Sequence, residues 1–399
     1  MESFQTKRHQ ALKRRCPMPQ PTTSGLAALT RSIFTALGIG NDAAGIDLPR
    51  CRHAVLCLVD GLGAGLLETY AHKAAYLASL NGAGQQLRSG FPSTTASSLA
   101  SLATAADSGG HGLVGAAFNL DDRHFNPLTW QLYDPITGAR DTAASEDNVV
   151  LSRSGWRDAV ANGVSISAFL PAAIAGSSYT RTVFNGAAVI PFGNPQDLLE
   201  QFRSLPKNTQ PQMSYLYFGE LDHVGHLYGP GSEQWQDVLQ DIDQRIQRLR
   251  ECIDNDSVLI VTADHGMTTL DDAKVVDFDL NPALQIGVAS ICADIRARHV
   301  YLQDPADREV LPRWQDILGA HFRVLSREQA VARGLFGAHV AQSASTRIGD
   351  LVVVAEEGAG LIRSLREPFQ SSWIGHHGAL TDAEQLVPLL IANGTGISA

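Results

Sequence analysis

The sequence has few cysteines and no long apolar stretches. Its five cysteines are scattered through 399 residues, and no two of them form a Cys-x-x-Cys pair. This pattern argues against a disulfide framework and against a cysteine zinc site, and it favours a reducing, cytoplasmic setting. No run approaches the roughly 18 consecutive apolar residues of a membrane-spanning helix. The first 25 positions contain basic residues but no apolar stretch, so we expect no secretory signal and no membrane span.

Positive charge is also scarce. The chain contains 31 lysines and arginines against 41 aspartates and glutamates, which gives a net charge of −10. The basic residues near the start are an exception, and we predict that residues 1–25 form a disordered basic arm. An acidic body argues against a stable nucleic-acid partner, and it suits a site in which carboxylates hold cations. The composition indicates no particular oligomeric state.

Three short apolar runs end close to acidic residues. Each run is followed by an aspartate: 54–59 by Asp60, 213–218 by Asp222, and 257–263 by Asp264. Uninterrupted runs of this length are typical of strands buried on both faces of a parallel sheet. Between the second and third runs, apolar residues at helical spacing follow Ser232, a predicted N-cap. Because ligands bind at the carboxyl ends of parallel strands, we expect the three acidic motifs to meet there.

The order of the segments predicts an α/β core interrupted by an insertion. A chain of this length exceeds the usual size of one domain. After residue 274 the pattern changes to a strand, a helix, a mixed segment and another strand, before a core-like sequence returns. We therefore predict a catalytic core formed by residues 26–274 and 366–399, and a small α/β cap formed by residues 275–365.

Asp222 and His226 are the first candidate pair of ligands. They are four residues apart, so in a helical turn they share one face, whereas His223 points elsewhere. A carboxylate and an imidazole at this spacing suit a divalent metal such as zinc. A capping aspartate near a surface histidine is the alternative interpretation.

The other candidates also lie beside glycines. Asp60 precedes a glycine, Asp264 and His265 follow an apolar run, and His376 and His377 lie in a Gly-His-His-Gly sequence. Taken singly, each has a simpler interpretation: Asp60 as part of an ordinary turn, Asp264 and His265 as a solvated strand end, and His376 and His377 as part of a surface loop. Together with the previous pair they provide enough ligands for two metal sites, each with open positions for water or substrate.

A stretch rich in hydroxyl groups precedes these motifs. The stretch from Phe91 to Ser101, with Ser101 included, contains six serines and threonines. Thr94 and Thr95 stand between a proline-containing turn and a predicted helix over 96–102. The N-terminus of a helix favours an anion. A threonine hydroxyl needs a metal or a base to become a nucleophile, and no Ser-His-Asp or G-x-S-x-G pattern is present. A metal-activated hydroxyl is therefore the simpler hypothesis, and N-capping of the helix is the alternative that can coexist with it.

Five motifs in this order resemble those of the alkaline phosphatase superfamily, and most closely those of its nucleotide pyrophosphatase/phosphodiesterase family. They are VLCLVDG, FPSTT, DHVGHLYG, ADHGM and GHHG, and the resemblance covers roughly residues 50–390. The family implies a layered α/β sandwich in which a mostly parallel central sheet is flanked by helices. It also implies that Thr95, rather than Thr94, is the nucleophile, and that His377, rather than His376, binds metal.

The resemblance further implies two divalent cations, expected to be Zn²⁺. One cation would be held by Asp222, His226 and His377, and the other by Asp60, Asp264, His265 and the hydroxyl of Thr95. Thr95 would attack phosphorus to form a phospho-threonine intermediate, which water then hydrolyses. Ser98 stands where nucleotide-cleaving members carry an asparagine, and it is a candidate oxyanion donor. Three histidines favour zinc over manganese or magnesium.

The function implied is hydrolysis of phosphate diesters or nucleotide pyrophosphates, with a small-molecule phosphate ester or nucleotide as substrate. A phosphomonoesterase or phosphonate hydrolase of the same superfamily is the alternative. A sulfate ester hydrolase is disfavoured, because the Cys-x-Pro-x-Arg pattern of sulfatases is missing. A non-catalytic metal-binding protein on this fold is an alternative of another class. Phe118 and Trp130 are candidates for stacking a nucleotide base, although packing in the core is the simpler role for each.

Overall fold

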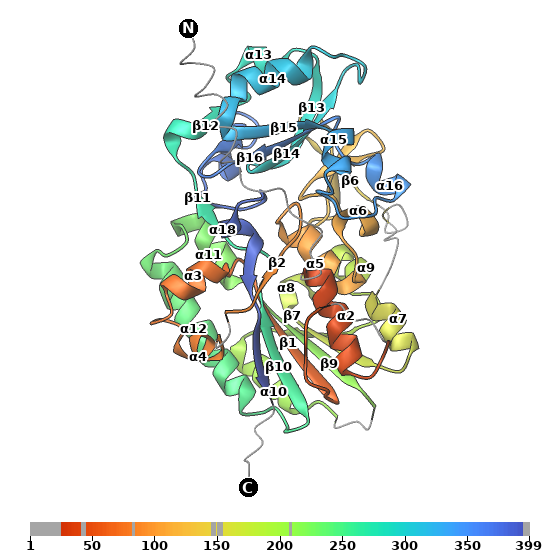
Figure 1. The fold of residues 1–399 in the computed structure, drawn as a ribbon, viewed down its shortest axis with the longest axis vertical. Coiled ribbons are helices and arrows are strands. Elements are labelled where there is room, and N and C mark those ends of the chain that lie inside the picture. The colour runs from red at the N-terminus through yellow and green to blue at the C-terminus, as the bar shows by residue number, and fades with distance from the viewer. Residues whose placement is uncertain are drawn as a thin grey trace.

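A six-stranded sheet lies at the centre of the larger part of the molecule (Figure 1). The structure is a computed structural model, and it describes residues 25–40, 45–81, 84–144, 149, 155–206 and 210–393. The strands of this sheet lie in the order β20 (Leu390–Asn393), β10 (Ser257–Thr262), β1 (His53–Val59), β9 (Gln212–Phe218), β7 (Ser165–Pro171) and β8 (Ala188–Phe192). Only β20 is antiparallel to its neighbour. The three predicted strands are thus confirmed as parallel neighbours, and every residue of β10 is buried.

Helices cover both faces of this sheet (Figure 1). One layer contains α3 (Ala64–Thr69), α4 (Ala75–Leu80), α11 (Glu220–Tyr228) and α12 (Glu233–Arg250), and the other contains α2 (Leu26–Ala36), α5 (Thr95–Thr104), α7 (Gly155–Ala161) and α9 (Ser178–Val183). The predicted helix after Ser232 is confirmed as α12: the Ser232 hydroxyl accepts a hydrogen bond from the Trp235 amide at 3.2 Å. The apolar residues of α12 face the core, with Trp235 fully buried.

The insertion has a sheet and a core of its own, in the upper part of Figure 1. Its antiparallel strands lie in the order β13 (Val288–Asp294), β14 (Ala297–Leu302), β16 (Leu351–Ala355) and β15 (Phe322–Ser326). Helix α14 (Val310–Leu318) buries Trp314 against this sheet. Strands β12 (Val275–Asp277) and β17 (Gly360–Ile362) pair in parallel where the chain enters and leaves the region. The boundaries at 275 and 365 stay a prediction, and the predicted basic arm lies, except for Gly25, outside the described residues.

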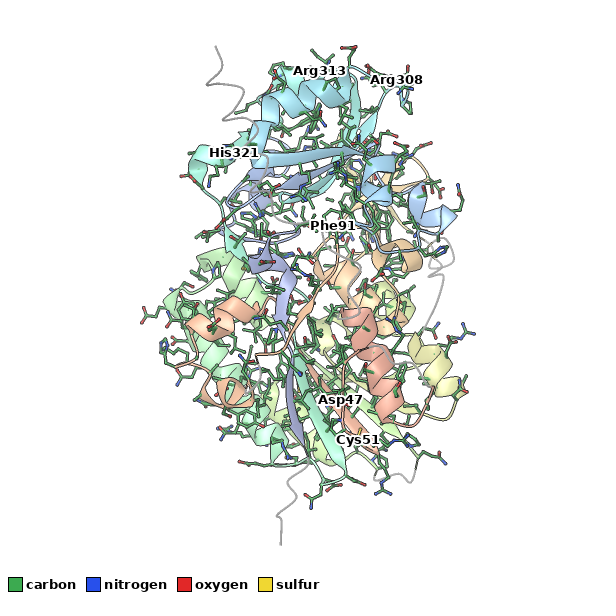
Figure 2. The ribbon with its side chains drawn as sticks, viewed as in Figure 1. Asp47, Cys51, Phe91, Arg308, Arg313 and His321 are labelled. Atoms are coloured by element: carbon green, nitrogen blue, oxygen red, sulfur yellow. The ribbon has the colours of Figure 1, made fainter. Side chains whose placement is uncertain are left out.

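A third sheet was not predicted from the sequence. It consists of β3 (Phe118–Leu120), β4 (Arg123–Asn126), β5 (Gln131–Tyr133) and β6 (Arg140–Ala143). Phe118 and Trp130 both pack edge-on against Phe125 and are buried. They therefore pack in the core and present no surface on which a nucleotide base could stack. Phe91 lies where the insertion meets the rest of the molecule (Figure 2), with its ring edge-on to Phe336 at 5.3 Å.

The remaining elements are short. Two further strand pairs are β2 (Gln86–Arg88) with β19 (Leu386–Pro388) and β11 (Thr268–Thr269) with β18 (Gly375–His376). The other helices are α6 (Ser108–His111), α8 (Ala172–Ala175), α10 (Pro195–Arg203), α13 (Pro282–Gln285), α15 (Arg327–Ala332), α16 (Gln342–Ser345), α17 (Pro368–Ser371) and α18 (Asp382–Gln385), with 3₁₀ turns at Asp272–Lys274 and Gly319–His321. Among the described helices, none combines the length and the apolar character that crossing a membrane requires.

Candidate metal centre

The topology brings all six predicted ligand residues to one edge of the large sheet. Strands β1 and β10 are parallel neighbours, so Asp60, just after β1, lies beside Asp264, just after β10. Strand β9 lies on the other side of β1 and leads directly into α11, which carries Asp222 and His226. His377 reaches the same edge because β18 pairs with β11, which follows the Asp-His motif after β10.

The first group, which we call the buried set, consists of Asp60, Asp264 and His265. One potential ligand atom from each lies within 4.8 Å of the others. The His265 Nε2 atom is 3.4 Å from Asp60 Oδ1 and 3.5 Å from Asp264 Oδ2. The side chain of Asp60 is 3% exposed, and the other two are fully buried.

The second group, the half-open set, consists of Asp222, His226 and His377. The Asp222 carboxylate lies 3.3 Å from His226 Nε2 and 3.7 Å from His377 Nε2. These side chains are 16%, 13% and 8% exposed, respectively. The two sets adjoin, because the ring of His265 stacks on that of His377 with the centroids 3.7 Å apart.

Backbone carbonyl groups fix the tautomers of the three histidines. The Nδ1 atoms of His226, His377 and His265 lie 2.8, 2.9 and 3.1 Å from the carbonyl oxygens of Gly375, Ser93 and Gly266, respectively. A carbonyl oxygen only accepts, so the hydrogen-bond network assigns each Nδ1 a proton that it donates, and in the neutral ring Nε2 then carries the lone pair. The Nε2 atoms of His226 and His377 face each other at 3.3 Å. Two facing lone pairs repel, whereas a cation bound by both removes the conflict.

The carboxylates are also incompletely satisfied by the protein. Asp60 Oδ1, Asp222 Oδ1 and Asp264 Oδ2 are buried and have no hydrogen-bond partner among the described residues. Burial raises the pKa of Asp60 well above its usual value, and the carboxyl groups of Asp264 and Asp222 raise it further. Leaving buried carboxylate oxygens unpaired is costly. These residues therefore fit divalent cations, which imidazole and carboxylate ligands bind well.

Thr95 lies beside the buried set. It is the first residue of α5, and its Oγ1 atom is 3.2 Å from His265 Nε2. Thr94 is the N-cap residue, but its side chain makes no capping hydrogen bond. The predicted capping by a side-chain hydroxyl is therefore wrong: the Thr94 carbonyl oxygen accepts the amides of Ser97 and Ser98 as the helix begins. The Ser98 hydroxyl is buried and has no hydrogen-bond partner among the described residues.

The two competing histidines take no part in either set. His223 is exposed on α11. His376 forms part of β18, and its Nε2 atom lies 3.0 Å from the carbonyl oxygen of Trp373. This placement agrees with the choice of His226 and His377.

Gly61 allows the two sets to approach each other. Its φ is +77°, which favours glycine, and a Cβ atom there would lie 3.1 Å from the Cα atom of Asp222. The glycine after Asp60 therefore both turns the chain and makes room for α11. This explains why the sequence motif at the end of β1 is Asp-Gly.

The structure adds Tyr217 and Glu384, which sequence reasoning missed. The Tyr217 hydroxyl donates to Asp60 Oδ2, which orients that carboxylate. Glu384 accepts a hydrogen bond from the Ala379 amide at 3.0 Å and pairs with Arg296 of the insertion at 2.6 Å. Glu384 thereby ties the loop after His377 to the insertion. The only sequence signal for Tyr217 was its place at the end of an apolar strand. The sequence carried no signal for Glu384.

The insertion and the segment after it also reach the half-open set. Burial raises the pKa of Asp294, at the end of β13, to about 6, while Arg298, His226, His265 and a hydrogen bond from the Thr94 side chain act in the opposite direction. The ring of Trp373 covers His226 with the centroids 4.1 Å apart. The centre is therefore bounded on one side by residues outside the predicted core motifs.

Comparisons with known proteins identify the fold. The structure resembles murine ectonucleotide pyrophosphatase/phosphodiesterase 5, solved as an inactive variant with AMP, with a TM-score of 0.63 and 18% identity over 85% of this chain and 87% of that one. It equally resembles phosphonoacetate hydrolase from Sinorhizobium meliloti in complex with phosphonoacetate, with a TM-score of 0.63 and 20% identity over 89% and 93%. At these identities the likeness shows the fold, and it confirms the predicted alkaline-phosphatase-like α/β architecture.

Sequence similarity identifies the family. Ectonucleotide pyrophosphatase/phosphodiesterase family member 7 of Mus musculus is 47% identical over 60 residues, a match that spans only 14% of this chain and 14% of the mouse protein. The sequence model for type I phosphodiesterase/nucleotide pyrophosphatase, in contrast, matches residues 54–380 and so includes all six ligand candidates and Thr95. The chain therefore belongs to the type I phosphodiesterase/nucleotide pyrophosphatase family, as its motifs predicted.

Proposed function

We propose that this protein hydrolyses phosphate diesters or nucleotide pyrophosphates, with Thr95 as the nucleophile at a centre that holds two zinc ions. The observation that carries the proposal is the position of the Thr95 hydroxyl. It stands at the start of α5, 3.2 Å from Nε2 of His265. A ligand atom of His265 groups within 4.8 Å both with the two aspartates of the buried set and with Asp222 and His377. His226 lies beside the second of these groups, 3.3 Å from Asp222. A nucleophile, a helix N-terminus and two cation-binding sets are the parts that phosphoryl transfer requires.

The buried set, joined by the Thr95 hydroxyl, would hold one cation, and the half-open set would hold the other. Bound zinc would supply Lewis acidity, which lowers the pKa of a coordinated hydroxyl and stabilises charge on phosphoryl oxygens. The imidazole ligands favour zinc over magnesium, which prefers oxygen ligands. Tyr217 and the backbone carbonyl groups of Ser93 and Gly375 hold the ligands in the orientation that this requires.

In the proposed reaction, Thr95 Oγ1 attacks phosphorus in line with the departing oxygen and forms phospho-threonine. The half-open set lies beside the buried set and is the more exposed of the two, so the leaving group departs on that side, toward solvent. Water then attacks the phospho-threonine from the same side and regenerates the hydroxyl. The Ser98 hydroxyl, which lacks a partner among the described residues, is available to donate to a phosphoryl oxygen.

Hydrolysis of a phosphonate is a second candidate function, and one observation favours it. The phosphonoacetate hydrolase of Sinorhizobium meliloti matches over 89% of this chain with the same TM-score as the murine phosphodiesterase. Phosphomonoester hydrolysis and metal binding without catalysis have no such observation in their favour. The substrate proposed is a small phosphate ester or nucleotide rather than a nucleic acid, and the cytoplasmic setting stays a prediction.

The decisive experiment compares Thr95→Ala with Thr94→Ala. The zinc-loaded proteins are assayed on bis(4-nitrophenyl) phosphate, 4-nitrophenyl phosphate and a dinucleotide. We expect wild-type turnover of the diester and the dinucleotide, loss of turnover in Thr95→Ala with close to two zinc ions retained, and residual activity in Thr94→Ala. Mass spectrometry of acid-quenched wild-type protein should find the phosphoryl group on Thr95.

Three results would reject parts of the proposal. Turnover of the monoester alone would reject the phosphodiesterase assignment. An inactive Thr94→Ala beside an active Thr95→Ala would move the nucleophile by one residue. Retention of two zinc ions without turnover of any substrate would favour a non-catalytic metal-binding protein.

A further inference from the structure

Asp294 is a carboxylate that the proposed reaction does not use. It is the last residue of β13, and in the hairpin with β14 it pairs with Ala297. The residue before it, Ala293, has a φ of +76°, which is unusual for a residue other than glycine. Strain of this kind persists only where the surroundings enforce it, and it concentrates at functional sites. The insertion therefore places Asp294 in a defined position instead of leaving it on a loose turn.

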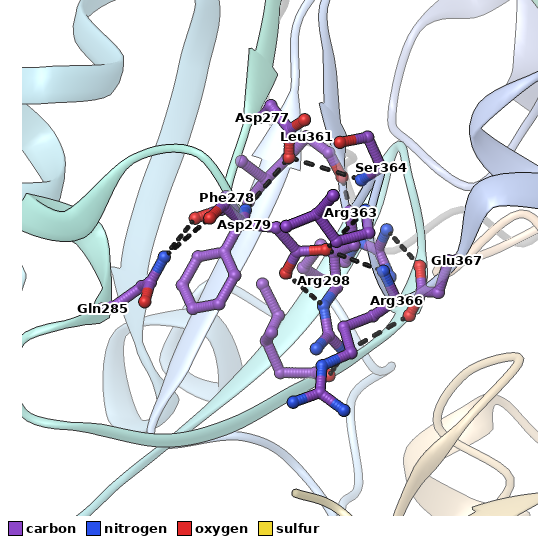
Figure 3. Close-up of polar contacts among 12 residues, drawn as sticks. Asp277, Phe278, Asp279, Gln285, Arg298, Leu361, Arg363, Ser364, Arg366 and Glu367 are labelled. Carbon is purple, nitrogen blue, oxygen red and sulfur yellow. Dashed lines mark hydrogen bonds and ion pairs between the residues drawn. The ribbon is translucent and has the colours of Figure 1, made fainter. Parts of the chain in front are cut away.

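Arg298 holds the backbone next to Asp294, and Figure 3 shows this arginine together with Leu361 and Glu367. Its guanidinium group is buried, and Nη1 donates to the carbonyl oxygen of Ala293 at 2.6 Å. Its other nitrogens donate to the Leu361 carbonyl oxygen at 3.1 Å and to Glu367 at 2.7 Å. All three nitrogens of the guanidinium group therefore have acceptors other than the Asp294 carboxylate.

The same network holds the segment that covers His226. Glu367 also contacts Arg363 at 3.4 Å, and Arg363 contacts Asp279 at 3.4 Å (Figure 3). Glu367 immediately precedes α17, which leads to Trp373. Two guanidinium groups and two carboxylates thus offset each other within the network. Asp294 is left over as a negative charge that forms no ion pair within the described part of the chain.

A small cavity separates Asp294 from Trp373. Asp294, Ile295, Gln370 and Trp373 line it together with three histidines, of which His226 and His377 belong to the half-open set. Its volume is about 10 Å³, which is room for a group the size of one water molecule. Asp294 Oδ2 is buried and has no hydrogen-bond partner among the described residues.

These features select for a small cation. A carboxylate oxygen without a partner accepts a charge-assisted hydrogen bond from an ammonium group. An ammonium group is about the size of a water molecule, whereas a trimethylammonium group or a nucleotide base exceeds the cavity. A carboxylate-bearing substituent would be repelled by Asp294.

We propose that Asp294 is a specificity-determining residue that binds a primary ammonium group on the leaving group of the substrate. The inference rests on the proposed function, in which the leaving group departs beside the half-open set. The substrate class is then a phosphate ester of a short amino alcohol. Thr95 Oγ1 forms a bond to phosphorus as the bond to the amino alcohol oxygen breaks, and the proton lost by the Thr95 hydroxyl passes through solvent to that oxygen. Hydrolysis of the phospho-threonine releases the phosphate product and restores the hydroxyl, so one water molecule is consumed.

The test compares three esters that give the same phosphorus product. Zinc-loaded protein is incubated with the 2-aminoethyl, propyl and choline esters of methyl phosphate, and ³¹P NMR follows the release of methyl phosphate. Wild-type protein should prefer the aminoethyl ester over the propyl ester by about tenfold or more in kcat/KM, the effect of one charge-assisted hydrogen bond. Asp294→Asn and Asp294→Ala should both lose this ratio. Asp316→Asn, which removes an exposed charge from α14 of the same insertion, should keep it.

A binding measurement with phosphonates tests the same inference without turnover. Calorimetry should show tighter binding of 2-aminoethylphosphonate than of propylphosphonate to zinc-loaded wild-type protein, and equal binding of the two to Asp294→Asn. If none of these esters, bis(4-nitrophenyl) phosphate or a dinucleotide is hydrolysed, the proposed function fails, and the binding ratio still decides the role of Asp294. Equal kcat/KM and equal binding in the wild type, or an unchanged ratio in both Asp294 variants, would overturn the inference. Preference for the choline ester over the aminoethyl ester would overturn the assignment to a primary ammonium.

Discussion

The two ligand sets differ in how the fold supports them. The buried set stands at the ends of two adjacent strands of the central sheet, and two of its three side chains have no solvent exposure. The half-open set combines a helix with a loop that follows the insertion, and its side chains are 8–16% exposed. The buried set is therefore part of the rigid frame beside Thr95, whereas the half-open set is accessible to solvent and to the residues of the insertion.

The largest effect is expected from the buried set. Asp264→Asn should lower kcat/KM by more than about 1,000-fold, beyond the roughly 100-fold cost of losing an outer partner of a metal ligand. The reason is that Asp264 is a direct ligand candidate whose place nothing from solvent can fill. Kinetics on a phosphodiester and zinc content by elemental analysis check this. Retention of both zinc ions with near-normal activity would refute the assignment of this set.

A smaller and reversible loss is expected from the half-open set. His226→Ala should lower kcat/KM by about 100-fold, and added imidazole should restore part of it, because the missing ring lies in a partly exposed position. His265→Ala, in a fully buried position, should gain nothing from imidazole. Rescue profiles of the two variants measured side by side check the contrast. Equal rescue of both would show that the difference in exposure has no functional meaning.

Tyr217→Phe should lower the zinc affinity less than loss of a ligand does. Its hydroxyl donates to Asp60, so removing it frees one ligand to rotate without deleting it. Zinc affinity should fall by about tenfold, the lower end of what outer partners contribute. Competition with a chelator measures the affinity, and unfolding in urea serves as the control for stability. An unchanged affinity would mean that the sheet alone orients Asp60.

The smallest effect concerns stability without metal. Asp60→Asn removes one of the converging carboxylates, which repel each other in a buried site when no cation is bound. The metal-free variant should therefore be more stable than the metal-free wild type by about 1 kcal/mol. Urea denaturation after chelation measures this, with Asp316→Asn as the matched control. A lower midpoint for Asp60→Asn would show that the carboxylate is structurally favourable even without a cation.

The sequence was most informative where one local rule decides the structure. The apolar runs before Asp60 and Asp264 predicted parallel strands, since only strands buried on both faces are apolar throughout. The spacing of Asp222 and His226 predicted a shared helical face, and α11 provides it. Ligands that follow strand ends are predictable because parallel topology collects strand ends at one edge.

Other features depend on contacts that no local pattern encodes. The strands of the sheet from β3 to β6 are three or four residues long, too short to show an alternation. The ion pair of Arg296 and Glu384 joins residues far apart in the sequence, and both look like ordinary surface charges until the fold buries them. Asp294 lines a cavity with His226 and His377, and it follows Ala293, whose positive φ an alanine in a sequence does not signal.

The late position of His377 in the chain has a consequence for how the centre is assembled. A nascent chain that has emerged only as far as the insertion contains every residue of the buried set, but the half-open set lacks one of its three members. That member arrives only when β18 is made and pairs with β11. A cation held by the half-open set would therefore have its full coordination only after the chain has returned from the insertion. Its binding would report that synthesis has passed the last motif and that β18 has paired with β11.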